Sequence, residues 1–213
     1  MRSETRPNAK PETVIGNSMK NALSTILIFI TQFLLAQSLE ANLDSKIDSL
    51  KSENIRNYII YSSNCQGSDA QIKCIETNQI IILWLFKNEV WYKKLSNCEI
   101  EKDKEISESK VFKNLKDNFN QIKLEEILEP TFRTIKTIKK GRKNIEIIKD
   151  TKVTTSHYCG IELKINFQDE YIYKNFPDYY IKWERENINY QKNMNSKLFK
   201  LIQIILEETN NKK

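Results

Sequence analysis

The chain has 213 residues, with 34 basic and 28 acidic side chains and a formal net charge of +6. Only four glycines and four prolines are present, which disfavours long disordered linkers and a turn-dense β-sandwich and favours one packed domain. Lysine far outnumbers arginine and acidic residues interleave with the basic ones, so the composition argues against a nucleic-acid-binding protein.

The first element is an apolar run near the N-terminus. Lys20 precedes an uncharged stretch, Ala22 to Ala36, and a polar, acid-bearing segment follows. This order is typical of an export signal. We therefore expect residues 19–37 to be a signal peptide that sends the protein to the periplasm or outside the cell. Residues 1–18 are then a disordered extension or the product of a mis-assigned start codon, with translation beginning at Met19.

Two alternatives remain for the run at residues 22–36, namely an uncleaved membrane anchor and a helix of the core. As a helix the run spans about 22 Å, which is short against a hydrocarbon layer of about 30 Å. Cleavage is expected after Ala36, which leaves Gln37 first, or after Ser38, and we expect one domain over residues 38–213.

The first half of this domain contains a helix, a strand and a hairpin. Leucine and isoleucine recur at spacings of three and four over residues 39–54, which predicts an amphipathic helix. β-Rich segments predict strands at 58–62, 71–76, 79–87 and 90–95, with a turn at Asn88 and Glu89. The run at 79–87 is almost continuously apolar, so we expect a central strand covered on both faces, with Trp84 and Trp91 in or beside the core.

The second half adds helices and further hairpins. Ser107 is a candidate N-cap for a helix with an apolar stripe from Val111 to Ile122, and Pro130 ends that region. Alternating patterns predict strands at 132–139, 144–148, 153–158, 160–167 and 171–174, and a helix at about 195–208. The sequence thus predicts an α+β domain in which an antiparallel sheet of hairpins carries N-terminal, central and C-terminal helices.

The densest basic stretch runs from Arg133 to Lys143 around a turn at Gly141. The alternation of polar and apolar residues here predicts a solvated hairpin. Binding of an anionic surface or polymer is the alternative.

Four cysteines follow the signal: Cys65, Cys74, Cys98 and Cys159. An even number in an exported chain predicts two disulfides, for which three pairings exist. We favour Cys65–Cys74 with Cys98–Cys159. A zinc site is the weaker alternative, because no C-x-x-C pair occurs.

Catalytic motifs are absent from the sequence. His157 is the only histidine, and a disulfide at Cys159, two residues away, would remove the thiolate that a Cys–His pair requires. No phosphate-binding glycine motif and no metalloprotease motif occur, so no cofactor and no metal ligand is predicted. Carboxylates are scattered, as in Glu125, Glu126 and Glu129, and a hydrolase would need two of them across a cleft.

Aromatic residues gather late in the chain. The segment Phe176-Pro-Asp-Tyr-Tyr resembles a loop, so Tyr179, Tyr180 and Trp183 are the candidates for an exposed recognition surface.

The pattern as a whole resembles small exported proteins of unknown function from AT-rich bacteria of the Bacteroidota type. The resemblance rests on Leu-Leu-Ala-Gln at 34–37, on the hairpin from Leu83 to Leu95 followed by Asn97-Cys98, and on His157-Tyr-Cys159. The resemblance implies export, and it supplies no activity that could be carried over to this chain.

From these observations we expect a non-catalytic exported module, stabilised by disulfides, that recognises a protein or glycan and meets the membrane only through its signal. A secreted hydrolase with a carboxylate site and a protein tethered by residues 22–36 are the alternatives. A deep cleft with convergent carboxylates would favour the enzyme, and a flat sheet face with exposed Tyr or Trp would favour binding.

Overall fold

The structure is a computed structural model that describes residues 39–65, 78–96, 99–156 and 158–210. The chain divides into two units, Met1–Asn42 and Leu43–Lys213, and only residues 39–42 of the first unit are described. The expected extension, signal peptide and cleavage sites therefore lie outside the described residues.

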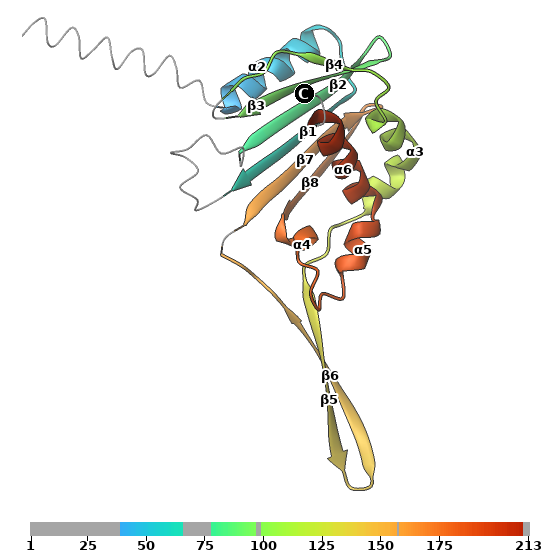
Figure 1. Cartoon of the computed structure of the whole chain (residues 1–213). Coiled ribbons are helices and arrows are strands. Elements are labelled where there is room, and N and C mark those ends of the chain that lie inside the picture. The colour runs from blue at the N-terminus through green and yellow to red at the C-terminus, as the bar shows by residue number, and fades with distance from the viewer. Residues whose placement is uncertain (1–38, 66–77, 97–98, 157, 211–213) are drawn as a thin grey trace, which may run out of the picture. The chain divides into compact units, whose positions relative to one another are not determined.

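Among the described residues, six strands form one antiparallel sheet in the order β4-β3-β2-β1-β7-β8 (Figure 1). The strands are β1 (Tyr58–Cys65), β2 (Gln79–Phe86), β3 (Glu89–Ser96), β4 (Lys104–Ile106), β7 (Cys159–Phe167) and β8 (Glu170–Pro177). Helices α2 (Leu39–Ser52), α3 (Val111–Leu124) and α6 (Lys197–Asn210) accompany them. The predicted α+β class, with helices at the start, middle and end of the domain, is confirmed.

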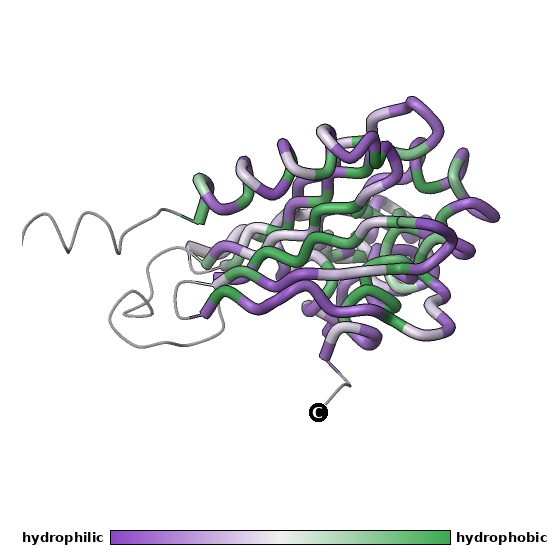
Figure 2. Tube along the Cα trace, turned by 90° about the horizontal axis from the view of Figure 1, so that it is seen from above, coloured by the Kyte–Doolittle hydropathy of each residue, from purple (hydrophilic) through white to green (hydrophobic). Residues whose placement is uncertain are grey.

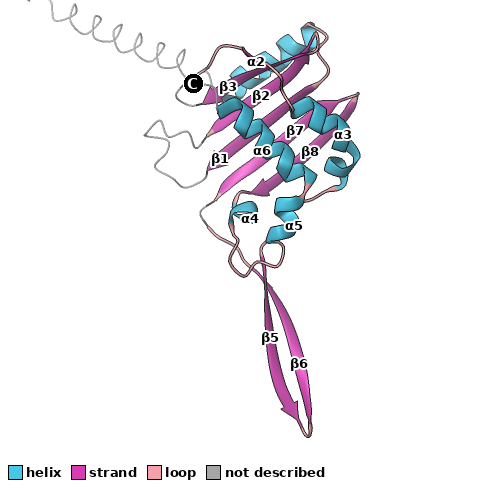
Figure 3. Ribbon diagram, turned by 45° about the vertical axis from the view of Figure 1, so that its right-hand side comes forward, coloured by secondary structure: helices cyan, strands magenta, loops and turns pink. Residues whose placement is uncertain are grey.

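One face of the sheet carries the main core. Every second residue of β7 is buried, because period-two alternation turns one side of the strand towards the helices. The apolar stripes of α3 and α6 cover this face, as Figure 3 shows. The fully buried members of this core include Ile59, Ile81, Leu83, Leu115, Ile122, Leu163, Ile165, Leu198, Leu201 and Ile205.

The opposite face is covered over β2 and β3 by α2, from Leu43 onwards. Leu50 is fully buried, as are Ile82 and Leu95 on the strands, and Lys46 places its ammonium 3.9 Å from the centre of the Trp84 ring. Figure 2 shows α2 along one side of the sheet, with hydrophobic and hydrophilic residues alternating in the strands. β2 is thus a central strand covered on both faces, as its apolar run predicts.

The tight turn between β2 and β3 falls one residue earlier than expected. Lys87 and Asn88 both have positive φ, at 51° and 68°. Two consecutive residues of this kind form the turn whose twist matches a two-residue hairpin. Glu89 is therefore the first residue of β3 rather than part of the turn.

Two strands stand apart from the sheet as a long hairpin, β5 (Thr131–Lys140) and β6 (Lys143–Lys152). Their ladder joins all ten residues of each strand, so the hairpin is longer than the predicted 132–139 and 144–148. The strand expected at 153–158 is wrong: the described residues there form no strand, because they lead from the end of β6 back to β7. We call the hairpin Thr131–Lys152 the arm.

Three other details of the structure differ from the prediction. The helix expected after Ser107 begins at Val111, because Ser107 directly follows the edge strand β4 and the side chain of Ser109 accepts the Val111 N–H. Two short helices, α4 (Tyr179–Lys182) and α5 (Tyr190–Asn195), were not predicted. The C-terminal helix begins at Lys197, after α5 has ended.

A disulfide joins Cys65, at the end of β1, to Cys159, at the start of β7. The favoured pairing of Cys65 with Cys74 and of Cys98 with Cys159 is therefore wrong. The reason is register: β1 and β7 are antiparallel neighbours, and Cys65 and Cys159 are direct partners in the ladder. Cys74, Cys98 and the strand expected at 71–76 lie outside the described residues.

Candidate recognition surfaces

The three predicted recognition residues lie together beside the root of the arm. Tyr179 and Tyr180 pack edge to face with ring centres 4.9 Å apart, and Tyr158 packs on Tyr179 at 5.8 Å. Trp183 packs edge to face on Phe132 of β5 at 5.9 Å. All are half-buried rather than freely exposed, and burial raises the pKa of Tyr179 to about 12. They thus form an aromatic support at the root of the arm, and a role in recognition stays a prediction.

Asparagine side chains fix the same root by hydrogen bonds to the main chain. Asn187 Oδ1 accepts the N–H of Thr131 at 3.1 Å, and its amide donates to the carbonyl of Trp183. Asn189 donates to the carbonyl of Glu129 at 2.9 Å. Because the side chains of a loop hold the first residues of β5, the direction in which the arm leaves the domain is set. No pattern in the sequence predicts this role for the asparagines.

Two ion pairs continue this attachment. Lys152, the last residue of β6, lies 2.7 Å from Glu129. Arg133 and Asp150 face each other across the ladder and make two hydrogen bonds of 2.8 Å, which lower the pKa of the Asp150 carboxyl. Beyond Arg133 and Asp150, towards the turn, the two strands of the arm are held together by the hydrogen bonds of their own ladder.

From Arg133 to Lys152 every residue of the two strands is exposed. Among them are five isoleucines with 40–57% of their surface in water: Ile135, Ile138, Ile145, Ile147 and Ile148. Figures 1 and 3 show the hairpin extending from the end of the domain that carries α4 and α5. A two-stranded hairpin that packs on the domain only at its root is marginally stable in water.

The net positive charge of the protein is concentrated in the arm. Residues 131–152 contain eight basic and two acidic side chains, a net charge of +6, which equals that of the whole chain. The remaining sequence contains as many acids as bases. Four of the bases flank the glycine of the turn: Lys139, Lys140, Arg142 and Lys143. Gly141 itself has a φ of +65°, which a residue with a side chain adopts only at a cost.

A second exposed surface lies on the sheet, over β7 and β8. Tyr171 and Tyr173 are 60% and 50% exposed, and both point to the face opposite α3 and α6, because Ile172 between them is buried. Lys164, the ladder partner of Tyr173, forms a 2.9 Å ion pair with Glu162. This is the flat face with exposed tyrosines that favours binding over catalysis.

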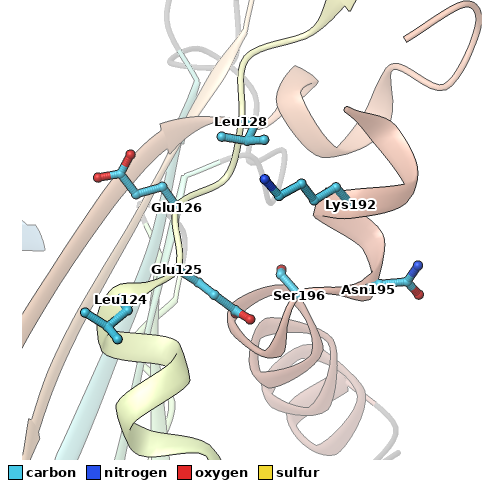
Figure 4. A pocket seen from close by; sticks show the side chains of 7 residues that line it. All are labelled: Leu124, Glu125, Glu126, Leu128, Lys192, Asn195 and Ser196. Atoms are coloured by element: carbon cyan, nitrogen blue, oxygen red, sulfur yellow. The ribbon is translucent and has the colours of Figure 1, made fainter. Parts of the chain in front are cut away.

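The carboxylates named above do not converge on a cleft. A hollow of about 560 Å³ lies between the end of α3 and the end of α5, and it is lined by Glu125, Glu126 and Lys192 (Figure 4). Glu125 accepts the backbone N–H of Leu198 at 2.9 Å, and Glu126 points in the opposite direction. Glu125 therefore acts as a support for α6 rather than as half of an acid–base pair.

Other catalytic arrangements are limited in a similar way. Cys159 is in a disulfide and offers no thiolate, and His157 lies outside the described residues. In the described ranges no group of His, Cys, Asp and Glu is placed to hold a metal ion. No helix among the same residues has the length and apolar character needed to cross a bilayer.

No family model, no curated protein and no solved structure matches this chain.

Proposed function

We propose that the protein is a non-catalytic recognition module that works after export, and that the arm is the element that contacts its partner. The arm supports this proposal more than any other feature. It exposes five isoleucines, holds the net charge of the chain and is attached to the domain only at its root. Exposed apolar patches in a folded protein mark sites of interaction.

Export is part of the proposal. The disulfide between Cys65 and Cys159 supports it, because such bonds persist in oxidising compartments. The apolar run at residues 22–36 supports it from the sequence. We place the working protein in the periplasm or outside the cell, with the cleaved signal at residues 19–37. Retention of the run as a tether would leave the role of the arm unchanged.

Site-specific photo-crosslinking in intact producing cells tests the role of the arm. A benzophenone side chain replaces Thr134, which is exposed on β5, and in a matched variant it replaces Gln121, which is exposed on α3. We expect adducts from position 134 and none from position 121. Adducts of equal yield from both positions, or none from position 134, would contradict the proposal. The benzophenone attacks protein, glycan and lipid alike, so the result does not depend on the partner's class.

A further inference from the structure

The register of the arm divides its side chains between two faces of different chemistry. Directly paired residues in an antiparallel ladder point to the same side. One face, which we call the lysine face, consists of Thr134, Lys136, Ile138, Lys140, Lys143, Ile145, Ile147 and Lys149. The other, the mixed face, consists of Arg133, Ile135, Thr137, Lys139, Asn144, Glu146, Ile148 and Asp150.

The lysine face combines an apolar centre with a cationic rim. Ile138 and Ile145 are direct partners, and Ile147 follows on the same side of β6. Four lysines surround these three residues, and no acidic residue lies on this face. Both acidic residues of the arm, Glu146 and Asp150, lie on the mixed face.

This chemistry restricts the partner. A second copy of the arm is disfavoured, because pairing would bring two charges of +6 together. A nucleic acid would be gripped by arginines and by aromatic rings that stack on bases, and the lysine face carries neither. An anionic bilayer suits both parts, since lysine ammonium groups reach the phosphates while isoleucines enter the boundary with the acyl chains.

The apolar centre of the arm is too short, and its tip too charged, for the arm to enter a membrane tip first. The apolar centre spans the ladder levels of residues 136–138 of β5, about 10 Å at about 3.4 Å per residue, against a hydrocarbon layer of about 30 Å. Insertion would also carry the four bases beside Gly141 into that layer. The arm therefore suits a position flat on the surface.

We infer that the arm binds an anionic lipid bilayer through the lysine face, with Ile138, Ile145 and Ile147 in the headgroup boundary. This rests on the proposed function and names its partner. It also extends our expectation from the sequence, in which only the signal segment meets the membrane. The mixed face, where Arg133 pairs with Asp150, stays in water.

Hydrogen exchange of the full chain, followed by mass spectrometry, tests the inference without interference from the apolar N-terminus. Exchange is read on peptides from residues 131–152, so binding through another segment does not contribute. We expect vesicles with phosphatidylglycerol to slow exchange in the arm and vesicles of phosphatidylcholine alone to leave it unchanged. Slowing should decline with added salt, because screening weakens attraction between exposed charges.

Two matched pairs of variants locate the contact. Lys140→Gln with Lys143→Gln on the lysine face should weaken vesicle binding on the order of 30-fold, about five- to sixfold per charge. Lys113→Gln with Lys116→Gln, two exposed residues of α3, makes the same change in net charge and should have little effect. Ile138→Thr with Ile145→Thr should weaken binding roughly tenfold, and Ile135→Thr with Ile148→Thr on the mixed face should not.

Two outcomes would overturn the inference. One is equal weakening by both isoleucine pairs or by both lysine pairs, since binding would then be independent of the face. The other is an arm that is protected by polyglutamate or by an oligonucleotide but not by anionic vesicles, which would assign it to an acidic protein or to nucleic acid. In that case adducts from position 134 would still support the recognition role, whereas their absence would remove both proposals.

Discussion

Single asparagine side chains determine how the parts of this domain meet. Asn193 on α5 is almost fully buried, with 1% of its surface exposed. It accepts the N–H of Leu128 at 2.8 Å and donates to the carbonyls of Leu128 and Tyr180 at 2.8 and 3.0 Å. One amide thus joins three segments, the loop before β5, α4 and α5, which support the arm.

We therefore expect Asn193→Ala to lower the free energy of unfolding by about 2–4 kcal/mol, because it leaves buried backbone groups without partners. Urea unfolding followed by far-UV circular dichroism measures the change. Asn195→Ala, an exposed position on the same helix, is the control and should change little. Equal effects of the two substitutions would show that the amide of Asn193 does not hold the root.

The burial of Tyr61 predicts that the free energy of unfolding depends on pH at high pH. Its side chain is 4% exposed in the core, and burial raises the pKa of its phenol. The folded state therefore keeps this proton to higher pH than the unfolded state. The stability that the buried phenol contributes is complete below the ordinary tyrosine pKa of about 10. This stability is lost as the pH rises through the pKa of Tyr61 in the folded state.

Tyr61→Phe keeps most of the packing and removes the titration. Above pH 10 we expect the free energy of unfolding of the wild type to fall more steeply with pH than that of the variant. Urea titrations at half-unit intervals from pH 8 to pH 11 give both slopes. Parallel slopes would mean that the phenol is not desolvated in the folded protein.

At the scale of elements, the arm is an addition to a domain that does not need it. All residues from Thr134 to Lys149 are exposed, and the core lies between the six-stranded sheet and its helices. The stability of the domain and the function of the arm should therefore separate in experiments.

Replacement of residues 134–149 by Asn-Gly joins Arg133 to Asp150 through a two-residue turn. We expect the free energy of unfolding to change by no more than about 1 kcal/mol, since a two-stranded ribbon in water is only marginally stable. Thermal unfolding by calorimetry measures it. A loss of cooperative unfolding would show that the arm belongs to the folding unit.

The sequence predicted those elements whose pattern is long and regular. The apolar run of β2, the stripe from Val111 to Ile122 and the alternation in β7 each identified the correct element. The three-residue β4 and the one-turn α4 were missed, because they are shorter than the periods on which such predictions rest. The free-standing position of the arm was missed too: alternation gives the faces of a strand but not its neighbours.

The candidate surfaces were predictable to a similar degree. The composition predicts the basic hairpin and the cluster of late aromatic residues, with Tyr179, Tyr180 and Trp183 exposed. The packing of Trp183 on Phe132 and of Tyr179 on Tyr158, and the support from Asn187 and Asn193, depend on contacts between segments that are apart in the chain. The disulfide pairing depended in the same way on strand order, which no spacing of cysteines reveals.

At the scale of the whole molecule, one covalent link joins the first strand of the sheet to the second half of the chain. Cys65 and Cys159 are separated by 94 residues, and a loop of that size restricts the unfolded chain strongly. The bond closes the end of the sheet at which the chain returns from the arm.

Reduction of this bond should lower the free energy of unfolding by about 4–5 kcal/mol on the chain-entropy account. Guanidinium unfolding with and without a reductant measures the difference. Cys65→Ala with Cys159→Ala should reproduce the reduced value and should not respond to the reductant at this bond. Equal stability of the wild type in both conditions would contradict a structural role for the bond.

The central claim is that the domain works after export, in a compartment where this disulfide closes. Mass spectrometry of the protein recovered from producing cells, with free thiols alkylated at lysis and peptides prepared without reductant, tests it most directly. The account predicts a linked pair of peptides that contain Cys65 and Cys159, and an N-terminus at Gln37 or just after it. Intact protein that begins at Met1 or Met19, with both cysteines alkylated, would contradict it.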